Sequence, residues 1–151
     1  MNDPFIGNKN EIYAGELPAT SFYPALKFSD FQEVFGFLAT QSEKAIEMQM
    51  TIDRAAVHSQ LKNLVVNHPN LESYSQVSFE DSTTAEVFYK NAVFSLTAAN
   101  LIGKIMATDG TKNAADRQAA LTEKEGHLLS QYRQAIDTLT GESSGYTMEL
   151  I

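Results

Sequence analysis

Apolar residues at helical spacing run through most of the chain between residues 28 and 141. A short first helix is expected to begin at Ser29, whose hydroxyl can cap it, because the apolar positions that follow share one face. Residues 42–67 carry a second stripe, with Ser42 and Thr51 both suited to start a helix, so this segment forms either one helix or two. Pro69 ends the stripe, and residues 69–82 are predicted to form a loop.

Two longer helices are predicted over residues 83–107 and about 113–140. The first, capped by Ser82 or Thr83, is apolar around most of its circumference, which is typical of a helix in the middle of a bundle or between subunits. The second keeps one apolar stripe beside a charged face, and Gly126 favours a bend within it. The expected fold class is all-α: a small bundle of about four helices, with an extended N-terminal arm and a strand-like C-terminal tail.

The two ends of the chain follow neither helical pattern. Residues 1–27 are punctuated by glycine and proline yet rich in aromatic side chains, so an ordered arm is expected, lying in a groove of this subunit or of a neighbour. Residues 142–151 begin as a polar hinge and then alternate apolar and polar, as in a half-buried strand. Such a tail is either frayed or completed by strand addition to another chain. The predicted units are therefore an arm (1–27), a bundle (28–141) and a docking tail (142–151).

Composition narrows the classes of function. With 11 basic and 19 acidic residues, the net charge is −8, which disfavours binding to nucleic acid or to an anionic membrane. The acidity suits either solubility or the wall of a channel through which a polyanion slides without binding. The absence of cysteine excludes disulfides, thiolate nucleophiles and cysteine-based metal sites. No signal peptide or membrane-spanning stretch is recognisable, so a soluble, cytoplasmic protein is expected.

The sequence gives no positive support for catalysis. The three histidines, His58, His68 and His127, are scattered, and His58 is placed on the polar side of its helix. Glu123 and His127 stand four residues apart, but the Glu-x-x-His pairs of a di-metal bundle are missing. Serine-hydrolase elbows and glycine-rich nucleotide loops are absent as well. No catalytic residue, cofactor site or metal ligand is therefore predicted, and function is expected to lie in protein contacts.

Several segments carry a resemblance to a known family over most of the chain, from about Phe22 to the C-terminus. The strongest is Val87–Leu101, which is similar to an "FYxxAVxxxAxAxL" helix and is followed by an Asp-Gly-x-Lys turn. The others are Phe22-Tyr23-Pro24, Thr51 to Leu71, Arg133 to Ile136 with Gly141, and the Leu150-Ile151 end. Together they resemble the head completion (stabilisation) proteins, called L, of temperate contractile-tailed bacteriophages. Residues 41–50 look like an insertion, and the N-terminal arm does not align.

The resemblance implies a structural adaptor of the virion. Such a protein forms a ring, twelve-fold in the family pattern, beneath the portal at the capsid vertex after DNA packaging, and links the head to a neck or tail terminator protein. It is made in the host cytoplasm, and DNA passes through the ring without specific binding. Carried onto this chain, the portal-docking tail comprises Gly145, Tyr146, Thr147, Met148, Glu149, Leu150 and Ile151.

Ring contacts are expected to involve both long helices and the arm. The candidates are Phe88, Ala99, Gly103, Tyr132, Phe22 and Tyr23. Ala99 and Gly103 would let a neighbouring backbone approach closely. An equally supported alternative is that Gly103 is simply a glycine tolerated in the packing. Two other classes stay open: a helical regulator or assembly chaperone that binds one partner, and, with the least support, an enzyme built on a helical bundle.

Overall fold

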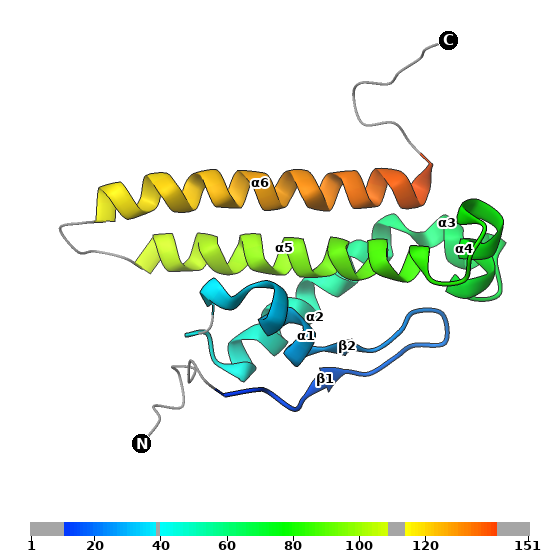
Figure 1. Cartoon of the computed structure of the whole chain (residues 1–151), viewed down its shortest axis with the longest axis horizontal. Helices are drawn as coiled ribbons and strands as arrows, with labels where there is room; N and C mark the ends of the chain where they lie inside the picture. The colour runs from blue at the N-terminus through cyan, green and yellow to red at the C-terminus, as the bar shows by residue number, and fades with distance from the viewer. Residues whose placement is uncertain (1–10, 39, 109–113, 142–151) are drawn as a thin grey trace, which may run out of the picture.

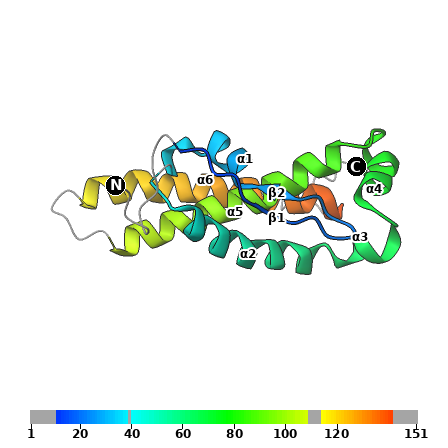
Figure 2. The same cartoon turned by 90° about the horizontal axis from the view of Figure 1, so that it is seen from below.

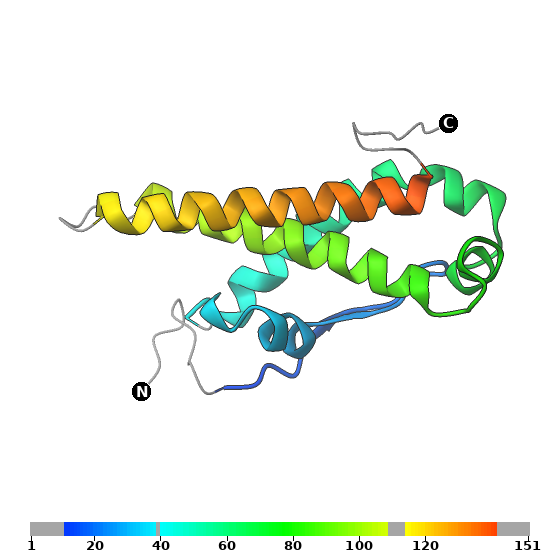
Figure 3. The same ribbon diagram turned by 45° about the horizontal axis from the view of Figure 1, so that its top comes forward.

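Two long antiparallel helices, α5 (Thr84–Thr108) and α6 (Ala114–Thr140), pack against each other and extend along the long axis of the molecule (Figure 1). The computed structural model describes residues 11–38, 40–108 and 114–141. Helix α5 packs against α6, α2 and α4, and in Figures 1 and 3 it lies between α6 and the hairpin. Its side chains are buried around most of the circumference, so the middle of the bundle, one of the two places that the sequence allowed, is where this helix lies. The all-α fold class is likewise confirmed, apart from one small two-stranded sheet.

Helix α2 (Glu43–Gln60) is continuous and packs against α5. The Ser42 hydroxyl caps it by accepting a hydrogen bond from the Ala45 amide at 3.1 Å, as predicted. Thr51 does not start a second helix, because its hydroxyl donates to the Glu47 carbonyl oxygen within the same helix. The break comes instead at Leu61, which leaves helical geometry before α3 (Lys62–Asn67).

A helix replaces most of the loop that the sequence predicted over residues 69–82. Helix α4 (Leu71–Phe79) is capped by the Asn70 side chain, which accepts a hydrogen bond from the Ser73 amide at 2.7 Å. The loop prediction was therefore wrong: the serine-rich segment forms a helix that packs against α5, with Leu71, Tyr74 and Ser75 buried. Of the two predicted caps of α5, Thr83 directly precedes the helix and its carbonyl oxygen accepts from the Val87 amide, but the side chain that accepts the amide hydrogens of Thr83 and Thr84 is that of Asp81.

The N-terminal arm forms a β-hairpin. Strand β1 (Glu16–Leu17) pairs antiparallel with β2 (Leu26–Lys27), with Leu17 opposite Leu26. Helix α1 (Phe28–Val34) follows at once, and a 3-10 turn, η1 (Gly36–Leu38), leads toward α2. Helix α1 begins one residue before Ser29, and no side chain caps it, so the predicted Ser29 cap was wrong.

The arm packs into the core of its own chain. Its buried side chains join the same apolar cluster as those of α2, α4 and α5: Tyr13, Leu17, Phe22, Tyr23 and Leu26. Gly15 also links the arm to the helices: its amide donates a hydrogen bond to the Glu43 carboxylate at 2.8 Å, and its carbonyl oxygen accepts one from the Phe28 amide. In the view from below, the hairpin crosses between α1 and α2, which lie on opposite sides of it (Figure 2). The groove that holds the arm is therefore formed by this subunit.

Candidate interaction surfaces

The predicted docking tail, Gly145 to Ile151, lies outside the described residues, but its point of departure is well defined. Helix α6 ends at Thr140, and Gly141 follows with a positive φ of 77°, the left-handed conformation typical of a residue just beyond a helix. The Tyr74 hydroxyl donates a hydrogen bond to the Leu139 carbonyl oxygen, which ties the end of α6 to α4. The tail thus leaves the bundle from an anchored position.

Three of the six candidate ring contacts are packed inside their own chain. Phe22 and Tyr23, in the turn of the hairpin, are buried, and Ala99 is buried within the helical core. These three side chains present almost no surface to another subunit in the folded chain.

The other three candidates lie at contacts between helices of this chain. Phe88 is half-buried and stacks on Phe79, with ring centroids 5.7 Å apart. Tyr132 on α6 accepts a hydrogen bond from the Gln60 side chain at the end of α2. Gly103 faces α6, where a Cβ atom added to it would lie 3.3 Å from a Glu125 carboxylate oxygen. Among the described residues, the atom that approaches this glycine is therefore the end of a side chain of α6 and not its backbone.

A cluster of aromatic rings joins the arm to the helices around His58. The Tyr23 ring stacks on the imidazole with centroids 3.9 Å apart and on the Tyr89 ring at 4.6 Å. The His58 Nε2 atom lies 2.7 Å from the Tyr89 hydroxyl oxygen. His58 is thus part of the packing between α2, α5 and the arm, which corrects its predicted place on the polar face of α2.

The ionisation of this cluster argues against acid–base catalysis. Burial, with a smaller contribution from the Arg54 charge, lowers the pKa of His58 to about 4. Burial raises the pKa of Tyr23 to about 12 and raises that of Tyr89 further. All three groups are consequently neutral at pH 7, whereas an efficient general acid or base has a pKa near the working pH.

A second polar group, Asp53, is buried where α2 meets α5. Its carboxylate accepts hydrogen bonds from the Asn100 amide at 2.8 Å and from the Gln49 amide at 3.1 Å. Burial raises the pKa of this carboxyl, and the hydrogen bonds from Gln49 and Asn100 act in the opposite direction. Because the carboxylate is enclosed by its partners, we interpret it as a link between two helices rather than a ligand site.

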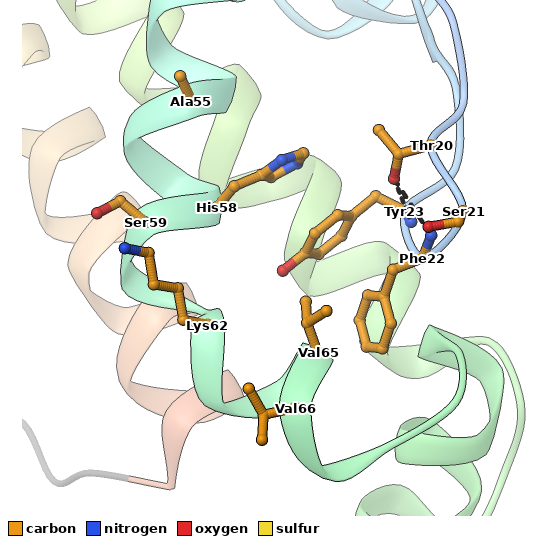
Figure 4. A pocket seen from close by; sticks show the side chains of 10 residues that line it. All are labelled: Thr20, Ser21, Phe22, Tyr23, Ala55, His58, Ser59, Lys62, Val65 and Val66. Atoms are coloured by element: carbon orange, nitrogen blue, oxygen red, sulfur yellow. Dashed lines mark hydrogen bonds between the residues drawn. The ribbon is translucent and has the colours of Figure 1, made fainter.

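An open groove of about 640 Å³ lies beside the aromatic cluster (Figure 4). The turn of the hairpin, residues 20–23, forms one wall, and α2 and α3 form the other. Apolar side chains of Phe22, Val65 and Val66 dominate the lining, with Lys62 as the cation among them. Such a surface can receive apolar side chains of another protein, and it offers no arrangement of nucleophile and base.

Exposed apolar residues occur on several helices. The large ones within the described residues are Ile12, Val34, Phe37, Met48, Ile52, Val65, Val66, Val77 and Val87. Within the stripe expected in this part of the chain, Val57, Leu61 and Leu64 are buried, whereas Ala56 on α2 and Val65 on α3 are exposed. Met48 and Ile52 on α2 were not predicted as a contact surface, although their separation of four residues places them on one face of the helix.

The part of the chain that the structure describes contains no group of three His, Asp or Glu side chains able to hold a metal ion. None of the described helices combines the length and apolar character needed to cross a lipid bilayer.

Comparison with protein families gives one match. The model described as "Phage head completion protein (GPL)" matches residues 17–151, from strand β1 through all six helices. No curated protein and no solved structure gives a significant match. The match covers far more than half of the chain and agrees with the resemblance seen in the sequence. The chain therefore belongs to the phage head completion protein family, whose members are structural components of the virion.

Proposed function

We propose that this protein is an adaptor that forms a ring beneath the phage portal after DNA packaging and links the head to a neck or tail protein. In this proposal the tail, residues 145–151, docks on the portal by adding a strand to one of its sheets. The observation that carries the proposal is the extent of the family match, which runs to residue 151 and so includes the strand-patterned tail.

Two features of the bundle support a docking role. The hydrogen bond between Tyr74 and the Leu139 carbonyl fixes the place from which the tail departs. A fixed departure point lowers the entropic cost of docking, since the end of α6 does not have to be ordered on binding. The net charge of −8 suits a ring whose lumen DNA crosses, because phosphate groups are repelled rather than held.

The test is binding of the purified chain to its portal, followed by light scattering and native mass spectrometry. The full chain is expected to add to the portal as a ring, and a chain lacking residues 145–151 is expected not to bind. Deletion of residues 1–7 provides a matched control of equal length that should bind normally. Normal binding by the tail-deleted chain would show that docking does not use the tail.

The same measurement separates the adaptor from a helical regulator or assembly chaperone. A regulator would stay monomeric or dimeric and would ignore the portal. A chaperone would bind during assembly and be missing from purified virions, where an adaptor must be present in a fixed ratio to portal. Mass spectrometry of purified particles therefore provides a second, independent check.

A further inference from the structure

The outer face of α2 is an apolar strip that no described element covers. Met48 and Ile52 are 58% and 57% exposed, and Ala55 and Ser59 continue the strip at intervals of three and four residues. Alternating intervals of three and four are those with which one helix packs against another. The buried residues of α2, such as Met50 and Val57, point to α5 on the other side of the helix. Helix α2 therefore has one face in the core and a second face suited to a partner.

Basic residues lie along this strip. Lys44 and Lys104 line a hollow beside Met48, and Lys62 lies at the far end, where the strip meets the groove lined by Val65 and Val66. Glu47 also lies on the exposed surface of α2. In a chain with a net charge of −8, a surface with this positive balance is suited to an acidic partner. We call Lys44, Met48, Ile52, Ala55, Ser59 and Lys62 the α2 face.

A surface with the opposite charge lies where α1 meets the start of α5. It is an open groove of about 460 Å³, lined in part by Val34 and Val87, each of which is 64% exposed. Asp30 and Glu33 line the same groove. Its cation, Lys90, is already paired with Glu86 on the same helix at 2.9 Å. We call this surface the Val34–Val87 groove.

The helices that carry the two surfaces, α1 and α2, lie on opposite sides of the hairpin (Figure 2). In the view from below, α1 lies along the upper side of the hairpin and α2 along the lower side (Figure 2). Two different, complementary patches on opposite sides give a head-to-tail contact, which closes into a ring when the rotation between copies permits. A strip that paired with itself would instead give a two-fold dimer.

We propose that the α2 face of one copy packs against the Val34–Val87 groove of the next copy, forming the lateral contact of the ring. The inference rests on the ring of the proposed function and adds the surfaces that build it. Met48 and Ile52 supply the apolar ridge, and Val34 and Val87 supply the apolar wall that receives it. The lysines of the α2 face then lie near Asp30 and Glu33, which orients the contact and excludes the self-paired arrangement by like-charge repulsion.

Cysteine cross-linking tests this pairing directly, because the natural chain has no cysteine. Variants Ile52→Cys and Val34→Cys are prepared separately, mixed, and oxidised in concentrated solution and in the presence of portal. The mixture is expected to give disulfide-linked heterodimers, and the double variant a ladder of longer multimers. Val77→Cys is the matched control, since Val77 is 75% exposed on α4 and belongs to neither surface.

Three results would overturn the inference. One is the absence of heterodimers both in solution and on portal, another is efficient linkage of Ile52→Cys to itself, and the third is equal linkage of the Val77→Cys control. A non-covalent check uses Ile52→Glu, which should lower the number of copies bound per portal, with Val77→Glu as its control. Circular dichroism of each variant verifies that the fold is retained.

The outcomes also distinguish this inference from the proposed function. If the chain binds portal as a ring but the cysteine pair gives no heterodimer, the lateral contact is wrong and the adaptor role stands. If heterodimers form while the full chain ignores portal, the contact stands and portal docking is wrong.

Discussion

His58 and Tyr89 join α2 to α5 through a contact of 2.7 Å between the imidazole Nε2 atom and the phenolic oxygen. The Tyr23 ring covers the imidazole from the arm side, so three segments far apart in sequence meet at one histidine. Since both groups are neutral, one of them donates this hydrogen bond and the other accepts it, according to the tautomer of the imidazole. Protonation of His58 would place a positive charge in this half-buried site, close to the charge of Arg54.

Stability should consequently fall in acid through His58. Its pKa is about 4 in the folded chain and 6.5 in the unfolded chain, so the unfolded state binds the extra proton first. The contribution of neutral His58 to the free energy of unfolding is complete above pH 6.5 and is lost as the pH falls toward 4. Urea unfolding across this window should show a smaller loss for His58→Gln than for the natural chain. His127→Gln, on the exposed side of α6, should lose stability as the natural chain does; equal pH profiles for all three would contradict the assignment.

Asp53 should matter for stability through its hydrogen bonds rather than its charge. Asp53→Ala leaves the amides of Gln49 and Asn100 without their acceptor and should cost about 1–3 kcal/mol in the free energy of unfolding. Asp53→Asn keeps an acceptor oxygen and removes the buried charge, so it should cost less. Because burial raises the pKa of the carboxyl, its ionisation destabilises the fold as the pH rises through that pKa. Asp53→Asn should remove this pH-dependent loss of stability. Chemical denaturation measures both effects, and equal stability of Asp53→Ala and the natural chain would refute the proposed link.

Glycine replacement should act in opposite directions at Gly126, within α6, and at Gly141, directly after it. Gly126 lies in the interior of the helix, is exposed, and has no atom within 4 Å of an added Cβ, so Gly126→Ala should stabilise the chain by up to about 1 kcal/mol. Gly141 has a positive φ, so Gly141→Ala should destabilise it by about 1 kcal/mol. Thermal unfolding of both variants provides the comparison. A loss of stability in Gly126→Ala would mean that this glycine has a role beyond the single chain.

The caps of the first two helices offer a direct comparison of two serines. Ser42→Ala should cost about 1 kcal/mol, because the Ser42 hydroxyl accepts the Ala45 amide at the start of α2. Ser29→Ala should change the free energy of unfolding by less than about 0.5 kcal/mol, since Ser29 caps no helix. Urea titration of the two variants tests the corrected start of α1. A larger cost at Ser29 would favour the cap expected from the sequence.

Helical periodicity accounts for what could be predicted from the sequence. The positions of α5 and α6 and the Ser42 cap follow from local spacing and local hydrogen-bond chemistry, which need no knowledge of the rest of the fold. Helix α4 was missed because serine is common in loops, yet Ser75 is buried and accepts the Ala85 amide at the start of the next helix. Its partner belongs to another helix, and the sequence does not reveal such a partner.

The hairpin and the site around His58 could not be predicted from the sequence, for a related reason. Strands of two residues are too short to show an alternating pattern, so β1 and β2 leave no periodic signal. His58 is polar by residue type, and its burial depends on Tyr23 arriving from the arm. The α2 face illustrates the reverse case: Met48 and Ile52 are apolar by type, and only the packing of α2 on α5 shows that they are exposed.

The packing of the arm has a consequence for the kinetics of assembly. Because Tyr13, Phe22 and Tyr23 complete the core of the chain that carries them, one copy contains every part that its core requires. We therefore expect refolding to be unimolecular, with a rate that does not change with protein concentration, whereas an arm exchanged between copies would make it concentration-dependent. Subunits of this kind can fold before they meet, so that folding and assembly are separate steps.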